Sequence, residues 1–181
     1  GKAVSIGLGN IASGDGAVAI GDPNYATGAG ATALGKDNNA TGVGAIALGN
    51  VNVASGDGST AIGSTNQANG LGAAALGFTN VATGKGAIAI GSNNSAAGDG
   101  TLAIGSNVVT SATDTLAIGN TAVAQGTRAV AIGNTAAATA TYAAAFGFNA
   151  EARDSYSTAV GTVAHAQGFG STAVGTLATA S

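Results

Sequence analysis

Short patterns in the sequence match motifs that bind nucleotides. Residues 14–19 fit the GxGxxA dinucleotide fingerprint, and later segments repeat it. That fingerprint requires a helix after the glycine turn, because the helix N-terminus binds the pyrophosphate, and glycines this frequent exclude helices. Residues 30–36 fit GxxxxGK, but Asp37 occupies the position where a serine or threonine would bind magnesium. Neither pattern predicts a nucleotide site.

Two other patterns could serve catalysis or metal binding. His165, the one histidine, could form a triad with Asp154 and Ser157, but its variable setting favours an ordinary surface histidine. A Gly-Asp-Gly triplet recurs around Asp15, Asp57 and Asp99. Each triplet supplies one carboxylate, whereas calcium takes about 6–8 oxygen ligands. The chain has no cysteine and no histidine cluster for zinc. We therefore predict no catalytic residue, no metal site and no cofactor.

Composition excludes further classes. Only 7% of the residues are charged, against about 25% in an average domain. The net charge is −3 and the five basic residues are scattered, so no basic patch for nucleic acid is present. Glycine and polar residues interrupt every apolar run before it reaches the ~18 residues of a membrane span.

A strict period of 14 residues organises the chain. Glycine recurs at this interval from Gly7 to Gly175, an apolar residue precedes each of these glycines, and alanine precedes that residue except at Ser5. We call residues 14 apart a column, named by its member among residues 10–23. Columns 20 and 21 include the pairs Ile20 and Gly21, Leu34 and Gly35, Ile62 and Gly63, Ile90 and Gly91, and Ile132 and Gly133.

Each 14-residue unit contains two short segments, such as residues 10–14 and 17–21, joined by two-residue connectors. Segments of this length suit strands, and the glycine-rich connectors suit tight turns. Since residues 14 apart are alike, successive units should stack at about 4.8 Å and form two parallel sheets. The sequence predicts an all-β parallel β-solenoid of about thirteen coils, one repetitive domain over residues 1–181. The expected local irregularity is residues 108–114, where Thr110 interrupts the alanines of column 12.

The two segments differ in how their faces alternate. Columns 11 and 13 are variable around the constant alanines of column 12, which is typical of a half-exposed strand. In the other segment, columns 17 and 19 are small and columns 18 and 20 are mostly larger and apolar. A sheet that is apolar on both faces must be covered on both. We expect column 20, including Ile132, to be a core column, and a second chain to cover one face.

The segments AVAIG, ATALG and AIALG, each followed by an ASG or ATG half-coil, resemble the YadA-like head repeat of trimeric autotransporter adhesins. The resemblance extends over essentially the whole chain. It implies a left-handed parallel β-roll and a side-by-side homotrimer. It also implies display on the outer membrane of a Gram-negative bacterium through a stalk and an anchor, neither of which is in this sequence. The implied partners are host extracellular matrix proteins or cell-surface receptors.

The exposed columns and connectors change along the chain. They are mainly small and neutral in the first seven coils, whereas later coils gather aromatic and charged residues. Aromatic and arginine side chains contribute the most contact energy per residue at interfaces. We predict ligand contacts at Arg128, Tyr142, Glu151, Arg153, Tyr156, His165, Gln167 and Phe169. The alternative is binding distributed over the repetitive surface. Other possible functions are a purely structural spacer or fibre segment, or an ice- or crystal-binding solenoid, although column 13 lacks the regular threonine ladder that the latter needs.

Overall fold

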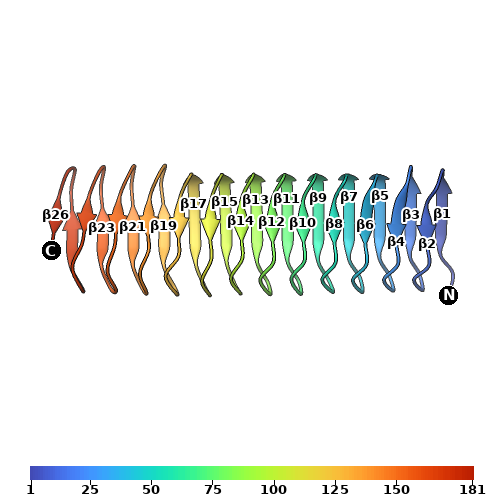
Figure 1. The fold of residues 1–181 in the computed structure, drawn as a ribbon, viewed down its shortest axis with the longest axis horizontal. Coiled ribbons are helices and arrows are strands. Elements are labelled where there is room, and N and C mark those ends of the chain that lie inside the picture. The colour runs from blue at the N-terminus through green and yellow to red at the C-terminus, as the bar shows by residue number, and fades with distance from the viewer. The chain divides into compact units, whose positions relative to one another are not determined.

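The computed structural model describes residues 1–181, which form β-strands and turns without a helix. The chain comprises two compact units, Gly1–Ser92 and Asn93–Ser181. Each unit repeats one coil of two short strands, and within each unit equivalent strands lie side by side in chain order (Figure 1). The prediction of an all-β parallel solenoid with about thirteen coils is confirmed. The structure offers no helix long and apolar enough to span a bilayer.

In the first unit, the strands of columns 18–22 form one sheet, which we call the first sheet, and the strands of columns 10–12 form the second sheet. The first sheet contains β1 (Val4–Gly7), β3 (Val18–Gly21), β5 (Thr32–Lys36), β7 (Ile46–Asn50), β9 (Thr60–Ser64), β11 (Ala74–Phe78) and β13 (Ile88–Ser92). The second sheet contains β2 (Ile11–Ala12), β4 (Asn24–Ala26), β6 (Asn38–Ala40), β8 (Val53–Ala54), β10 (Gln67–Ala68) and β12 (Val81–Ala82).

The second unit repeats this arrangement. Its second-sheet strands are β14 (Ser95–Ala96), β16 (Val109–Thr110), β18 (Val123–Ala124), β20 (Ala137–Ala138), β22 (Glu151–Ala152), β24 (His165–Ala166) and β26 (Thr179–Ala180). Its first-sheet strands are β15 (Leu102–Ser106), β17 (Leu116–Asn120), β19 (Val130–Ile132), β21 (Ala144–Phe146), β23 (Thr158–Val160) and β25 (Thr172–Val174).

All the strand pairs within each unit are parallel, and their register follows the period. Ala19 pairs with Ala33, and Gly21 pairs with Gly35, so that each residue stacks on its equivalent in the next coil. The expected irregularity at residues 108–114 is wrong. Thr110 pairs in register with Ala96 and Ala124, and its hydroxyl donates a hydrogen bond to the Ser95 carbonyl at 3.4 Å. The added hydroxyl and methyl groups of threonine therefore fit the column without shifting the chain.

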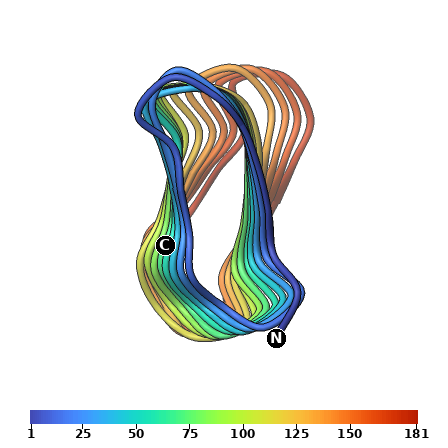
Figure 2. The same ribbon diagram turned by 90° about the vertical axis from the view of Figure 1, so that its right-hand side faces the viewer.

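The interior of each coil is lined by alanine. Within each unit the coils are flattened loops whose two long sides carry the two sheets (Figure 2). Ala19 and Ala33 of the first sheet and Ala26 of the second sheet are fully buried, as are the equivalent alanines of nearly every coil. Opposed sheets normally pack about 10 Å apart, and this interior is filled mainly by alanine, with serine or threonine at a few positions such as Ser59, Thr101 and Thr110. The small columns 12, 17 and 19 therefore form the core.

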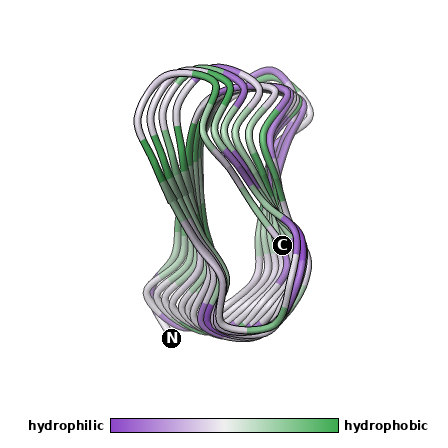
Figure 3. Cartoon of the chain, turned by 90° about the vertical axis from the view of Figure 1, so that its left-hand side faces the viewer, coloured by the Kyte–Doolittle hydropathy of each residue, from purple (hydrophilic) through white to green (hydrophobic).

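Columns 18 and 20 point outward from the first sheet. Leu34 is 43% exposed and Ile62 is 36% exposed in the single chain, and stripes of like hydropathy run from coil to coil within each unit (Figure 3). The prediction that Ile132 belongs to the core of the coil is wrong, because Ile132 lies on this outer face next to the buried Ala131. The physical reason is size, since the narrow interior accepts alanine and excludes isoleucine.

The glycines of column 21 allow the coils to approach each other closely at one turn. A Cβ atom added to Gly35 would lie 2.1 Å from the carbonyl oxygen of Gly49, and the φ angle of Gly35 is +119°. Both the short contact with the next coil and the backbone conformation therefore exclude a side chain at this position. The period of glycine thus follows from the stacking of one coil on the next.

A ladder of buried asparagines holds the same turn in the first unit. Asn52 donates from Nδ2 to the carbonyls of Leu48 at 2.9 Å and Gly63 at 2.8 Å. Its Oδ1 accepts from the backbone N and from Nδ2 of Asn66. We call column 10 of this unit the asparagine ladder, which comprises Asn10, Asn24, Asn38, Asn52, Asn66 and Asn80. It satisfies carbonyl groups that would otherwise be buried without a donor.

The asparagine column does not continue through the second unit. After Asn94 it becomes Val108 and then alanine, and from β19 onward the first-sheet strands contain three residues instead of five. In these coils the turn is closed by backbone groups instead, such as Gly133 N donating to the Ile118 carbonyl at 2.9 Å. Column 10 loses asparagine two coils before the strands shorten, since Val108 and Ala122 follow the five-residue strands β15 and β17. The strand register is kept across the change.

Whole-coil deletions test the register directly. Removing residues 63–76 joins Ile62 to Gly77, which keeps every column in phase, so the shortened chain should retain its β-sheet circular dichroism and one cooperative transition. Removing only residues 63–69 places first-sheet residues over second-sheet residues and should lower the melting temperature far more. Equal melting temperatures for the two deletions would contradict the parallel stacking.

Candidate functional site

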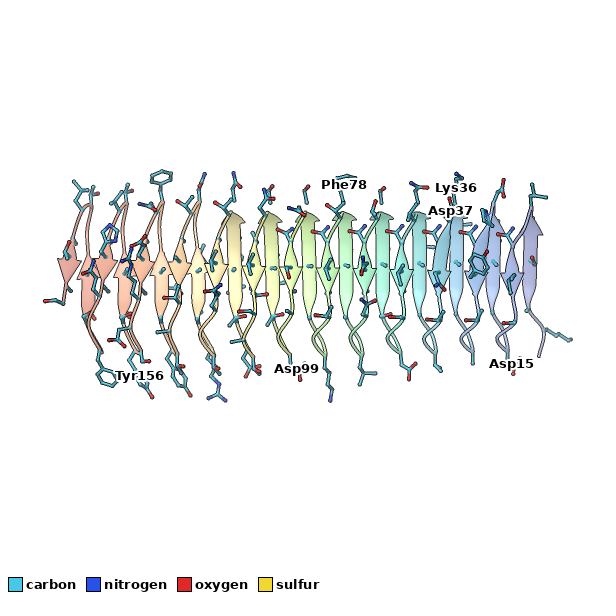
Figure 4. The ribbon with its side chains drawn as sticks, in the orientation of Figure 1. Asp15, Lys36, Asp37, Phe78, Asp99 and Tyr156 are labelled. Atoms are coloured by element: carbon cyan, nitrogen blue, oxygen red, sulfur yellow. The ribbon has the colours of Figure 1, made fainter.

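The surface, not a cavity, carries the candidate site. The structure contains no pocket and no group of three or more acidic, histidine or cysteine side chains placed to hold a metal ion. Lys36 of the GxxxxGK pattern pairs with its neighbour Asp37 at 3.3 Å on an exposed turn. Asp15 and Asp99 each project from a turn of their own unit (Figure 4). Their single carboxylates come from separate coils.

The catalytic triad that His165, Asp154 and Ser157 could have formed is absent from the structure. Ser157 Oγ donates to the carbonyl oxygen of Asp154 at 2.5 Å, and the Asp154 carboxylate accepts from the backbone N of Ser155 at 2.7 Å. His165 Nδ1 instead lies 2.8 Å from Oε2 of Glu151. The nucleophile and the base of a triad must lie within hydrogen-bond reach of each other, and these residues are engaged elsewhere.

Four of the predicted ligand residues form a continuous row on the turn that leads into the first sheet. The Arg128 guanidinium lies over the Tyr142 ring, 5.5 Å from its centroid. The rings of Tyr142 and Tyr156 are stacked with centroids 5.1 Å apart, and Phe169 meets Tyr156 edge-on at 5.4 Å. Asp114 extends the row through an ion pair with Arg128 at 3.6 Å. We call these five residues the turn ladder.

The turn ladder is highly exposed. Tyr156 is 55% exposed and Phe169 is 73% exposed, and Tyr156 projects from the end of its coil in Figure 4. Arg128 Nη1 donates a hydrogen bond to the Tyr142 hydroxyl. This hydrogen bond, reinforced by the Asp114 carboxylate, raises the pKa of Arg128 above its ordinary value. The row therefore presents aromatic edges, a phenol hydroxyl and a fixed positive charge to the surroundings.

The backbone of every turn-ladder residue except Phe169 is in the left-handed region. Column 16 has positive φ in every coil, and in the first unit it is always glycine, from Gly16 to Gly86. In the second unit Arg128, Tyr142 and Tyr156 hold the same conformation at φ of 58°, 60° and 61°. A left-handed conformation costs a residue with a side chain about 1–2 kcal/mol. Stacking returns about 0.5–1.5 kcal/mol per pair, so these side chains add little net stability.

Three other predicted residues form a second group, which we call the sheet-face cluster. Glu151 on β22 binds Arg153 through Oε2 and Nη2 at 2.5 Å and His165 on β24 at 2.8 Å. Glu151 and His165 are paired neighbours of column 11, and their side chains are only about a fifth to a quarter exposed at 20% and 24%. Arg153 is the exposed member. Gln167, in column 13, is exposed and follows directly after β24.

The eight predicted residues therefore occupy two surfaces instead of one. Arg128, Tyr142, Tyr156 and Phe169 lie on the turn, whereas the remaining four lie on the outer face of the second sheet. Asp114 was not among the predicted residues, although its spacing of 14 residues from Arg128 was a sufficient signal. Columns 11 and 13 face outward around the buried alanines of column 12, which confirms the predicted half-exposed strand.

The comparisons with known proteins agree with the repeat. The family model described as YadA head domain repeat (2 copies) matches residues 2–22, 26–51, 54–79, 82–107, 111–136, 138–164 and 166–181. No curated protein matches the chain. The matched segments extend through both units, and their boundaries follow pairs of the 14-residue coil. On this evidence of fold, period and family match, the chain belongs to the YadA head domain repeat family.

Proposed function

We propose that this chain is the head of a trimeric autotransporter adhesin on a bacterial outer membrane, where three copies lie side by side and bind host extracellular matrix proteins or cell-surface receptors. The family supports an adhesin-type domain. The observation that carries the proposal is the combination of an apolar outer face on the first sheet with an exposed aromatic row elsewhere on the coil. The first surface suits association of the chains, and the second suits contact with a ligand.

The first sheet supports association because it is apolar on both faces. Column 19 packs inside the coil, whereas columns 18 and 20 place Ile, Leu and Val side chains outside. Leu34, Ile62 and Ile90 are each more than a third exposed in the single chain. Parallel sheets are normally covered on both faces, and contiguous apolar patches on a protein surface mark interaction sites. Burying this face between chains would remove it from water.

A mass measurement tests the association. The chain should sediment at three times its monomer mass, and replacing both Ile62 and Ile90 with glutamate should shift it towards the monomer, because four-carbon apolar side chains become charges at the interface. Replacing Gln67 with glutamate, on the outer face of the second sheet, should leave the trimer intact. A monomer mass for the unaltered chain would contradict the proposal. In the trimer, Ile132→Ala should also lower the melting temperature, because it removes apolar contacts from this interface.

A binding experiment tests the adhesive function. The chain is applied to immobilised matrix proteins and to cultured host cells, and its retention is measured. One variant replaces Tyr142 and Tyr156 with glycine, the residue that column 16 carries in the first unit. A matched variant replaces Arg153 and His165 with serine. We expect the first variant to keep its melting temperature and lose most of its binding, and the second to bind like the unaltered chain.

The outcomes separate the alternatives. Loss of binding in the second variant alone would move the ligand site to the sheet-face cluster. Undiminished binding in both variants would support a distributed surface, in which many weak contacts act together through avidity. If the folded trimer binds no matrix protein and no cell, the chain is a spacer or fibre segment.

A further inference from the structure

The turn ladder contains a pair of tyrosines whose arrangement differs from that of the third tyrosine. Tyr142 and Tyr156 are stacked with centroids 5.1 Å apart and ring planes inclined by 13°. Both rings are exposed, by 41% and 55%. Tyr25, in the first unit, is equally exposed at 41% but lies on β4 between Ile11 and Asn39, which carry no ring. The chain therefore has one phenol pair and one single phenol.

The fold holds this pair in place. Tyr142 N donates to the Thr127 carbonyl at 2.9 Å, and Tyr156 N donates to the Thr141 carbonyl at 3.0 Å. Both backbones have φ near +60°, so both side chains leave the turn in the same direction. Arg128 covers one end of the pair, and Phe169, which has no hydroxyl, covers the other. The two phenols consequently have each other as their sole phenol neighbour in the ladder.

We propose that Tyr142 and Tyr156 form an oxidation-dependent covalent cross-link, a dityrosine that joins two successive coils. A haem peroxidase with hydrogen peroxide removes one electron and one proton from each phenol, and the peroxide is reduced to two molecules of water. The two phenoxyl radicals form one carbon–carbon bond between ring carbons next to the hydroxyls. Each of these carbons then loses its hydrogen, a proton returns to each oxygen, and both rings become aromatic again.

The position of the rings favours this bond over competing ones. The para carbon of each ring is bonded to Cβ and cannot couple. Two tyrosyl radicals can therefore join only through their oxygens or their ortho carbons. The two rings are stacked neighbours with centroids 5.1 Å apart, and both are exposed, by 41% and 55%. A modest tilt of the exposed rings towards each other would bring one ortho carbon of each together without displacing the coil. Tyr25 can couple only with a tyrosine of another chain.

The cross-link would close a loop of 14 residues between neighbouring coils. A covalent link of this kind restricts the unfolded chain, as a disulfide does, in a sequence that has no cysteine. On an exported surface protein, oxidants released by host cells would be the source of the reaction. The cross-link itself depends only on the geometry of the pair and is independent of the identity of any ligand.

The test is oxidation of the purified chain carrying Tyr25→Phe, with a haem peroxidase and hydrogen peroxide, followed by unfolding and trypsin digestion. Trypsin cleaves after Arg128 and Arg153, which places Tyr142 on the peptide 129–153 and Tyr156 on the peptide 154–181. We expect the chain to keep a monomer mass in denaturing electrophoresis, to lose two hydrogens and to gain dityrosine fluorescence. Sequencing of the linked species should release Ala129 and Asp154 together.

Two controls make the result decisive. Tyr142→Phe keeps the ring stack but removes one phenol hydroxyl, so it should abolish the linked peptides and the fluorescence of the monomer. Oxidation of the Tyr25→Phe chain in guanidinium chloride should lower the yield several-fold, because the unfolded chain no longer stacks the rings. Separate peptides 129–153 and 154–181 after oxidation, or an equal yield from the unfolded chain, would overturn the proposal.

Discussion

Replacing Gly63 with alanine is expected to destabilise the chain by about 3 kcal/mol or more. The added Cβ would lie 2.1 Å from the carbonyl oxygen of Gly77 and 3.1 Å from Nδ2 of Asn66. The φ angle of +119° at Gly63 also lies outside the left-handed region open to residues with side chains. Since the contact is with backbone, relief requires the two coils to separate. Thermal unfolding followed by circular dichroism measures the loss.

Gly44→Ala is the matched control. Gly44 also has positive φ, at +65°, but a Cβ at this position meets no atom within 4 Å. Alanine there should cost only the left-handed strain of about 1–2 kcal/mol. The second unit already places arginine and tyrosine in this column. If the two alanine variants melt at the same temperature, the close approach of the coils is not the reason that column 21 is always glycine.

The second large effect is expected from Asn52→Asp, which should destabilise the chain by about 3–5 kcal/mol at neutral pH. Asn52 is fully buried, and its Nδ2 group faces the carbonyl oxygens of Leu48 and Gly63. A carboxylate has the same shape but donates no hydrogen bond. It would leave those carbonyls unsatisfied and place a negative charge against them. Chemical denaturation of the variant and the unaltered chain measures the difference.

This variant should also acquire a pH dependence of known sign. Burial against carbonyl oxygens raises the pKa of the introduced carboxyl in the folded chain above its unfolded value of about 4. Its destabilisation is therefore smallest below that value and grows as the pH rises. Asn52→Ala, which also removes the donors but adds no charge, should cost about 2 kcal/mol at every pH. A pH-independent loss for both variants would contradict the role of the ladder as a buried donor.

The period predicted most of the fold, because like residues stack on like in a solenoid. Glycine at every fourteenth position predicted the pairing of Gly21 with Gly35 that the structure contains. The period did not decide which face of the first segment lies inside, since both faces are apolar. The larger residue at Ile132 suggested the core, but the width of the coil selects Ala131 instead. That width is a property of the two facing sheets together and is not visible in one strand.

The candidate site was predicted less well. The residue types of the turn ladder were identified, and the spacing between Arg128, Tyr142 and Tyr156 could have shown that they are stacked neighbours. Their separation from Glu151 and His165 depends on which columns lie on the turn and which lie on the sheet. The function of the column-10 asparagines was also not predicted, because their partners are backbone carbonyls, which leave no signature in the side-chain pattern.

The alanine interior has a consequence for how such a protein can vary. The residues that set the shape of the coil lie in the alanine and glycine columns and, in the first unit, in the asparagine ladder, while the outward columns contribute little to closing it. Lys36 and Phe78 occupy equivalent positions three coils apart in the first unit without altering the strand pairing. Substitutions at these exposed positions can therefore accumulate coil by coil at little cost to folding, and duplication of a coil copies a ready-made frame together with its surface.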